Sequence, residues 1–430
     1  MSVTLAVAGF GLMLAMMLTS IPIAVAMFIV GAGGGLLAFG KPFLESIASV
    51  VWGVQNENLL TCIPLFILLG EILLRSGIAD RMYVTLSAWL GRLPGGLLHT
   101  NIGCCALFAA TSGSSVATAA TIGTVALPSL HARGYSMRDS LGTIAAGGTL
   151  GILIPPSVNM IVYGSLTNQS IGKLFIAGII PGILLTLCFM LFIAATHILK
   201  GSRTRESLPP LAERVRLLAN LIPPAVVFGI VMGSLYFGIA TATESAALGV
   251  VTALFFAWRT GRLNREVLQN CFLQTARISG MVLLIIVAAF ILNLLISLTG
   301  IAETMTKWVT SLGLTGTTML FVLILFYLVL GMFMDVLSMQ VATIPITYPI
   351  VTALGVDPIW YGIFIVLMCE LGLITPPVGM NLFVVHGIRP DKGGIQDAIW
   401  GALPYAVIMI LFTLLLMAFP ALATWLPQHM

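Results

Sequence analysis

Apolar residues recur along the chain in long blocks that are separated by short polar stretches. A helix of about 20 apolar residues spans the roughly 30 Å hydrocarbon core of a bilayer, whereas a water-soluble helix shows an apolar stripe on one face. The pattern therefore predicts an all-α polytopic membrane protein. Continuous helices are expected near residues 3–20, 21–38, 58–75, 172–198, 219–238, 242–258, 273–299 and 398–425.

Two further apolar segments, 138–167 and 358–386, each carry a Pro-Pro pair near the middle, Pro155-Pro156 and Pro376-Pro377. Proline removes a backbone donor and clashes with the preceding turn, so each segment is predicted to be a helix broken at its centre. A break leaves backbone polar groups free, and a membrane protein keeps such groups only where protein or a cavity satisfies them. A proline pair that merely kinks its helix is the simpler alternative.

Two stretches, 95–128 and 316–350, are apolar at both ends and polar at the centre. The polar centres are Thr111–Ser115 and Gly331–Asp335. Each stretch is predicted to be a re-entrant hairpin that enters and leaves the membrane on the same side.

Composition supports the membrane assignment. Hydrophobic residues make up 59% of the 430 residues, charged residues make up 8%, and the mean hydropathy is +1.09. A water-soluble chain cannot bury that much apolar surface. No Lys or Arg precedes the first apolar stretch, so that stretch is expected to be a retained helix and not a cleaved signal.

Basic residues test the two hairpins, because cytoplasmic loops of membrane proteins are enriched in Lys and Arg. If both stretches are hairpins, only Lys41, Lys173 and Lys307 lie on the other side of the membrane. This count places both chain termini outside the cytoplasm. The residues expected on the cytoplasmic side are Arg75, Arg81, Arg92, Arg133, Arg138, Lys200, Arg203, Arg205, Arg214, Arg216, Arg259, Arg262, Arg265, Arg277, Arg389 and Lys392.

The two proline pairs belong to a longer repeat. Leu150–Pro156 matches Leu371–Pro377 at an offset of 221 positions, and Pro128 matches Pro349 at the same offset. Five predicted crossings separate the first hairpin from the second, and because five is odd the two copies should be inverted. An inverted repeat built around two broken helices is typical of secondary transporters, whose substrate and ion sites lie near the midplane. A channel could share the inversion.

The predicted breaks and tips suggest a cation site and a carboxylate site. Unwound carbonyls at 151–156 and 372–377 suit a small hard cation. The tip hydroxyls of Ser112, Ser114 and Ser115, the aligned Asp335 and the hydroxyl of Thr375 could complete its shell. The free amides of the second half-helices, which begin near Ser157 and Val378, would attract a carboxylate. Candidate substrate contacts are Ser115, Ser157, Asn159, Met380 and Asn381.

Acidic residues inside a membrane need a partner or a function. Asp335 and Glu370 are the best placed, and Glu71 and Glu244 lie nearer to helix ends, where a partner is expected. Glu370 has no acidic counterpart in the other repeat, so it either pairs with a cation or carries a proton. For Ser115, close helix packing explains the small side chain as well as a role in the site does, because small residues are common at membrane helix interfaces.

Together these motifs closely resemble the large membrane subunit of tripartite ATP-independent periplasmic (TRAP) transporters, over essentially the whole chain. The segments that carry the resemblance are Ile63–Glu71, Ser112–Ala117, Ala132–Tyr135, Pro155–Ser157, Ile176–Gly182 and Leu373–Asn381. This chain has Ala117-Thr118 where the family often has Ala-Asp, which leaves the local charge and the substrate preference open.

The resemblance implies a sodium-coupled importer of organic acids in the bacterial inner membrane, with both termini periplasmic. Its partners would be a small membrane subunit and a periplasmic substrate-binding protein, and its transport domain would move as an elevator against a scaffold. Sodium is the implied coupling ion, with no organic cofactor and no nucleic-acid partner. By the same resemblance and by the pseudosymmetry, sodium would be held by Ser112, Ser114, Gly151, Ile154 and Pro156 and by Asp335, Gly372, Thr375 and Pro377.

The expected organisation has scaffold helices in 1–94, the first repeat in 95–198, scaffold and arm helices in 199–315, and the second repeat in 316–430. No Walker-type phosphate loop, catalytic triad or metal-ligand cluster occurs, so an enzymatic role is not expected. A stand-alone sodium- or proton-coupled carboxylate symporter without a binding protein is the main alternative, and a channel or a membrane scaffold is the other. The sequence does not identify the organic acid.

Overall fold

The computed structural model describes residues 3–201 and 209–430, and these are helical, with no strand among them. Arg203 and Arg205 lie outside the described residues. Two short 3-10 helices cover Asn58–Thr61 and Leu218–Leu221. The α-helices are α1 Val3–Leu18, α2 Ile23–Phe39, α3 Lys41–Gln55, α4 Cys62–Arg75, α5 Ile78–Leu90, α6 Leu97–Ser112, α7 Ser115–Ala132, α8 Met137–Leu153, α9 Val158–Thr167, α10 Ile171–Leu199, α11 Leu211–Leu217, α12 Ile222–Tyr236, α13 Ala242–Arg259, α14 Arg265–Thr299, α15 Ile301–Ser311, α16 Gly316–Gly331, α17 Val336–Ala353, α18 Pro358–Leu373, α19 Met380–Gly387, α20 Gln396–Ala418 and α21 Ala421–Gln428.

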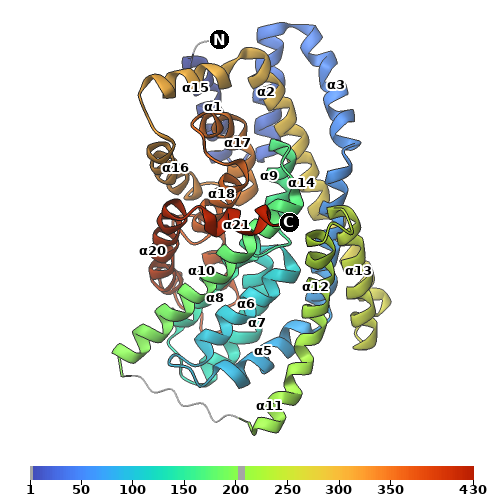
Figure 1. Cartoon of the computed structure of the whole chain (residues 1–430), viewed down its shortest axis with the longest axis vertical. Coiled ribbons are helices and arrows are strands. Elements are labelled where there is room, and N and C mark those ends of the chain that lie inside the picture. Colours follow the sequence, from blue (N-terminus) through green and yellow to red (C-terminus); the bar gives the residue numbers. More distant parts are fainter. Residues whose placement is uncertain (1–2, 202–208) are drawn as a thin grey trace.

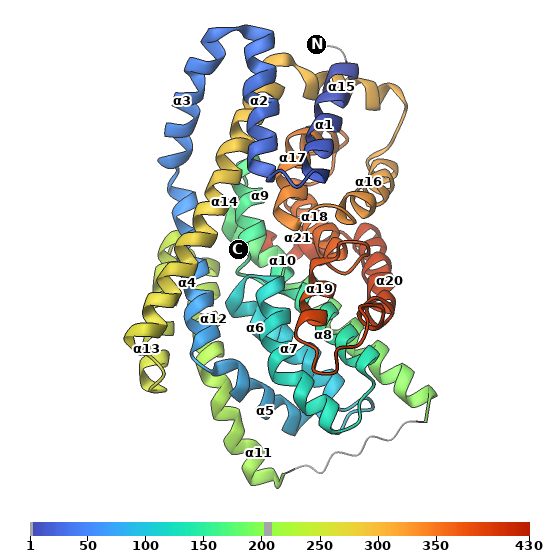
Figure 2. The same cartoon turned by 180° about the vertical axis from the view of Figure 1, so that it is seen from behind.

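The helices form an elongated bundle (Figure 1). Helices α1 to α3 and α15 to α17 occupy the upper part of Figures 1 and 2, and α5 to α8 with α11 occupy the lower part. The long helix α14 packs against α2 in the upper part and against α4, which leads into the lower part. The N-terminus lies at the upper end and the C-terminus near the middle.

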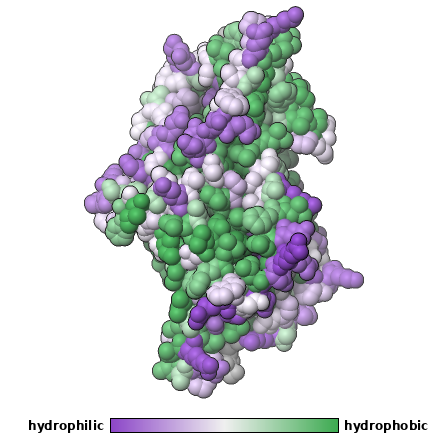
Figure 3. Space-filling model, turned by 90° about the vertical axis from the view of Figure 1, so that its right-hand side faces the viewer, coloured by the Kyte–Doolittle hydropathy of each residue, from purple (hydrophilic) through white to green (hydrophobic). Residues whose placement is uncertain are grey.

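Among the described residues, seven helical segments are long and apolar enough to cross a membrane, or eight if the bent pair α15–α16 counts as one span. Shorter apolar helices, including α2, α6 and α18, accompany them. On the face shown in Figure 3, apolar residues form a broad continuous area, with polar clusters toward the upper and lower parts. The prediction of a multi-pass all-helical membrane protein is confirmed.

Both predicted hairpins are helix pairs that turn at their polar centres. Helix α6 ends at Ser112 and α7 begins at Ser115, with Gly113 between them in the left-handed conformation at φ +62°. Helix α16 ends at Gly331 and α17 begins at Val336. Both turns therefore fall within the predicted polar centres, Thr111–Ser115 and Gly331–Asp335.

Both predicted broken helices are also present. The first is α8 and α9 with a break at 154–157, and the second is α18 and α19 with a break at 374–379. The Pro155-Pro156 and Pro376-Pro377 bonds are both cis. Every residue of Ser140–Leu153 and of Trp360–Leu373 is buried, so the first halves of the two broken helices form the centre of the molecule.

Several helices differ from the expected ranges, in most cases because polar or charged side chains lower the hydropathy. Helices α3, α5 and α15 were not expected, because each carries acidic and basic side chains that lower its mean hydropathy. Helix α14 begins at Arg265 and not near 273, since its first turns are polar. The segment expected as one helix at 398–425 is α20 and α21, separated at Phe419-Pro420.

Candidate functional site

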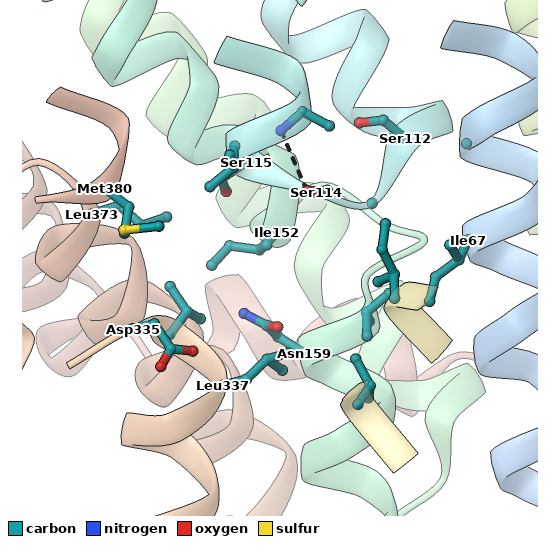
Figure 4. A pocket seen from close by; sticks show the side chains of 18 of the residues that line it. Ile67, Ser112, Ser114, Ser115, Ile152, Asn159, Asp335, Leu337, Leu373 and Met380 are labelled. Atoms are coloured by element: carbon teal, nitrogen blue, oxygen red, sulfur yellow. Dashed lines mark hydrogen bonds between the residues drawn. The ribbon is translucent and has the colours of Figure 1, made fainter. Parts of the chain in front are cut away.

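A cavity of ≈ 360 Å³ lies where both hairpin tips and both broken helices meet the helices α4 and α14 (Figure 4). The tip α6–α7 supplies Ser112 to Ala117 to its lining, and α17 with its cap supplies Asp335 to Leu337. The opposite wall consists of α4 residues around Gly70 and α14 residues around Met281. Both hairpin tips and both broken helices therefore border a single cavity.

The first tip packs directly on the first break. A Cβ added to Gly113 would lie 2.8 Å from the carbonyl oxygen of Pro156, and a Cβ on Gly151 would lie 2.8 Å from the carbonyl oxygen of Ser114. Ser115 Oγ donates to the carbonyl oxygen of Thr149 at 3.1 Å. These contacts bring the hydroxyls of the tip and the free carbonyls of the break together, because glycine allows the two backbones to approach.

The second tip packs on the second break in the same manner. A Cβ added to Gly331 would lie 2.7 Å from the Cα of Gly372, and the amide of Val378 donates to the carbonyl oxygen of Met332 at 3.2 Å. The Thr375 hydroxyl donates to the carbonyl oxygen of Leu371 at 2.6 Å. The amide of Val378, predicted as an anion contact, is thus already occupied by the tip.

Ser114 and Asp335 occupy equivalent positions in the repeat, and each caps a helix. Ser114 Oγ accepts from the amide of Ala117 at 3.4 Å, and Asp335 Oδ2 accepts from the amide of Ser338 at 3.2 Å. Each is the N-cap of the second helix of its hairpin. The Ser338 hydroxyl also donates to Asp335 Oδ1. Only the second tip carries a carboxylate.

Of the five predicted substrate contacts, three line the cavity, namely Ser115, Asn159 and Met380. The backbone carbonyl oxygen of Asn159 accepts a hydrogen bond from Gln340 Nε2 at 3.0 Å. The side-chain Nδ2 of Asn159 has no hydrogen-bond partner among the described residues. In Figure 4 this amide points into the space between Ile152 and Asp335. A free amide donor in a largely apolar cavity is suited to bind a substrate oxygen.

Ser157 and Asn381 do not line the cavity. Ser157 is buried and caps α9 by accepting from the amide of Met160 at 3.5 Å. Asn381 Nδ2 donates to the carbonyl oxygen of Ala145 at 3.1 Å, which connects the second broken helix to the first. The predicted substrate role of these two residues stays a prediction.

The cavity lining has no Lys, Arg or His among the described residues. Its two acidic members are Asp335 and Glu71, and Glu71 accepts from Arg75 Nε at 3.2 Å, one helical turn away. The partner expected for Glu71 near its helix end is therefore Arg75. An anionic ligand in this cavity would find no cationic side chain lining it.

Thr118 is a tip residue whose contacts sequence reasoning missed. Its Oγ1 donates to the carbonyl oxygen of Ser114 at 2.7 Å and lies 2.8 Å from Ser112 Oγ. A hydroxyl has one hydrogen, so Ser112 must donate to Thr118, which leaves the lone pairs of Ser112 Oγ as acceptors. The position four residues after the cap, where i to i−4 hydroxyl bonds form, was the available signal.

Glu370 is fully buried in α18, beside the backbone of Leu153 in the first broken helix. Neither of its carboxylate oxygens has a well-formed hydrogen bond in the described part of the chain. No cation among the described residues pairs with Glu370, and the alternative that it carries a proton stays a prediction. In the same described part, no cluster of three or more His, Cys, Asp and Glu residues could hold a metal ion.

The fold and the cavity define a polytopic transporter built on hairpins and broken helices. The family model of the tripartite ATP-independent periplasmic transporter, DctM component, matches residues 10–422. The chain belongs to this family and is a TRAP transporter large permease. This membership confirms the resemblance seen in the motifs.

Individual relatives agree with this assignment. The C4-dicarboxylate TRAP transporter large permease protein of Pseudomonas aeruginosa is 35% identical over 405 residues, covering 93% of each chain. The ectoine TRAP transporter large permease protein of Halomonas elongata is 30% identical over 381 residues, covering 88% of each chain. In fold, the chain is similar to the Alcanivorax borkumensis YdaH transporter, with a TM-score of 0.60 at 16% identity and 91% of each chain covered.

Proposed function

We propose that this chain imports an organic acid by sodium symport. The observation that carries the proposal is a substrate-sized cavity without a cationic side chain, flanked by two junctions of tip and break that are rich in oxygen. A carboxylate needs positive charge nearby, and two sodium ions held at these junctions supply it. Coupling follows from the same charge requirement, because the acid binds well only when sodium is bound.

The proposed ligands divide between the two junctions. Hydroxyl and carbonyl oxygens are the donors that hard cations prefer. The second junction adds the carboxylate of Asp335, so it should bind sodium more tightly than the first. The proposed ligands are Ser112, Ser114, Gly151, Ile154 and Pro156 at the first junction, and Asp335, Gly372, Thr375 and Pro377 at the second.

The energetics allow uphill uptake. Each sodium ion that moves down a membrane potential of 100 mV releases roughly 2.3 kcal/mol, before the concentration term is added. Two ions accompanying a monocarboxylate would leave a net inward positive charge. An elevator movement is proposed because α4 and α14 form one wall of the cavity and the tips form the other.

Relatives suggest the remaining partners. TRAP transporter permeases that are similar to this chain are named for C4-dicarboxylates, isethionate, sialic acid and ectoine, and the isethionate protein is named DctMQ. We propose that this chain works in the bacterial inner membrane with a small membrane subunit and a periplasmic binding protein that delivers the acid. The substrate is then chosen largely by the binding protein.

Uptake of radiolabelled acid into proteoliposomes tests the proposal. The complete complex, with the small subunit and the cognate binding protein, should transport only when an inward sodium gradient is present. Uptake of free acid without the binding protein would favour the stand-alone symporter. Uptake that is unchanged after sodium is replaced by potassium would overturn sodium coupling.

A further inference from the structure

A second polar cavity, of ≈ 490 Å³, lies away from the proposed transport site, between the first turns of α8, the last turns of α10 and the first half of α20. We call it the α8–α10–α20 pocket. These parts of α8, α10 and α20 lie on the predicted cytoplasmic side, where most Lys and Arg residues are expected. Its lining residues are Leu98, Ser136, Arg138, Asp139, Phe192, Ile193, Thr196, His197, Lys200, Trp400, Gly401, Pro404 and Tyr405.

The side chains that line the pocket carry mostly positive charge. Arg138 comes from α8, and His197 and Lys200 come from α10, so the basic groups converge from two helices. One acidic residue, Asp139, opposes them. Arg138 Nη2 donates to the carbonyl oxygen of Trp400 at 3.2 Å, and a guanidinium has five N–H donors, so donors remain for a ligand.

Exposed apolar side chains lie on two of the helices that form the pocket. Trp400 lines the pocket and is 54% exposed, and Leu199, next to Lys200 in α10, is 86% exposed. Ile198 on α10 and Leu403 on α20 are also exposed. Exposed tryptophan is typical of the headgroup level of a membrane, and apolar side chains next to it face acyl chains.

We propose that the α8–α10–α20 pocket binds the phosphate headgroup of an anionic phospholipid, with the acyl chains along the exposed apolar side chains of α10 and α20. Basic pockets between membrane helices bind such headgroups. A soluble anion would use the same basic groups but would gain nothing from Trp400 and the exposed apolar side chains of α10 and α20, and these side chains favour the lipid. The inference requires only that the chain spans a membrane, so it does not depend on sodium coupling or on the transported acid.

The test uses the full chain, purified and incorporated into nanodiscs of phosphatidylcholine mixed with phosphatidylglycerol. Native mass spectrometry then counts the phosphatidylglycerol molecules that stay bound. The double variant Arg138→Gln, Lys200→Gln should retain at least about fivefold less phosphatidylglycerol than the parent chain, because each basic residue adds to the attraction. The matched control Arg259→Gln, Arg265→Gln removes the same charge from exposed positions outside the pocket and should retain the parental amount.

Three outcomes would overturn the proposal. Equal losses in the double variant and in the control would show that surface charge acts without a site. Equal retention of phosphatidylcholine and phosphatidylglycerol would show that the headgroup is not recognised. Displacement of the lipid by millimolar inorganic phosphate would assign the pocket to a soluble anion. The single variant Lys200→Gln, at the exposed end of α10, should still lower retention about twofold if the double variant fails to fold.

Discussion

Ser114 and Asp335 show how one position in a repeat acquires two roles. Both cap the second helix of a hairpin, and both side chains line the cavity, but only Asp335 brings a negative charge. Capping could be predicted from the type of side chain at a helix start. The spacing of Thr118 from Ser114 indicated a bond to the carbonyl oxygen of Ser114. The contact of Thr118 with Ser112 could not be predicted, because it depends on how the tip folds.

Asp335→Asn should lower the apparent affinity for sodium at least tenfold while the protein stays folded. Asparagine keeps the N-cap, so the change removes the charged ligand and little else. The measurement is the sodium dependence of acid uptake in proteoliposomes. Asp357→Asn is the matched control, because Asp357 caps α18 by accepting from the amide of Trp360 at 2.8 Å, away from the cavity lining. Equal sodium affinity in both variants would make Asp335 purely structural.

Thr118→Val should destabilise the first tip by about 1 kcal/mol, the typical net value of a lost hydrogen bond, because it removes a hydroxyl that joins Ser114 and Ser112. Sodium affinity should fall as well, since the tip loses its fixed geometry. Thermal unfolding in detergent and sodium-dependent uptake are the two readouts. Thr118→Ser keeps the hydroxyl and should restore both, and a variant Thr118→Val with parental uptake would contradict the argument.

At the scale of elements, prolines and glycines made the hairpins and broken helices predictable. The wall formed by α4 and α14 could not be predicted, because the hydropathy of a helix does not indicate which other helix it contacts. Gly70 marks that contact: a Cβ there would lie 2.8 Å from the carbonyl oxygen of Ser112. The charged helices α3, α5 and α15 were missed because a hydropathy pattern averages over them.

Gly70→Val should disfavour the conformation described here, because the added side chain clashes with the backbone of the first tip. If that tip moves relative to α4 during transport, the variant should shift the protein toward another state and slow uptake at least tenfold. Hydrogen exchange of α6 and α7 would report the shift. Gly280→Ala in α14 is the control, since no atom lies within 4 Å of a Cβ built there. Unchanged exchange and uptake in Gly70→Val would argue against a moving contact.

The segment between α19 and α20 is fixed by Arg389, whose side chain is 2% exposed and pairs with Asp391 at 2.6 Å and with Asp397 at 2.9 Å. The hydrogen bonds from Arg389 lower the pKa of Asp391. Stabilisation by a carboxylate with a lowered pKa is present above its unfolded pKa and is lost as pH falls through the folded value.

We therefore expect Asp391→Asn to lower the unfolding temperature at neutral pH. The difference from the parent chain should begin to shrink near about pH 4, the unfolded pKa of an aspartate, and vanish below the lowered folded pKa. Thermal unfolding across this pH range in detergent is the measurement. Asp80→Asn removes the same charge from the exposed start of α5 and serves as the control. A difference that persists into acid would show that the side chain acts through packing.

At the scale of the whole molecule, the distribution of Lys and Arg among the loops predicts the orientation of the chain in the membrane. The sequence predicts both termini on the periplasmic side, because most basic loops then face the cytoplasm. Sequence alone could supply this, since the rule depends only on where Lys and Arg fall between helices. The relative placement of the two halves needed the fold, because it depends on which helices touch.

The orientation predicts that alkaline phosphatase fused after Met430 will be active, because that enzyme folds in the periplasm. The same enzyme inserted beside Lys392, in the loop between α19 and α20, should be inactive. Activity assays in whole cells measure both, with expression levels compared by immunoblot. The reverse result would invert the topology and would place Lys41 and Lys307 on the cytoplasmic side.

The crossing of α8 and α20 also constrains how the chain can diverge. A Cβ added to Gly142 would lie 2.3 Å from the carbonyl carbon of Gly401, and no side chain separates the two backbones. The first helix of one matching segment is thus in direct contact with the helix that follows the other. A larger residue at either position would need a compensating movement of the other helix. Because no residue is smaller than glycine, a change at one position cannot make room for a larger residue at the other, and family members should keep glycine at both positions.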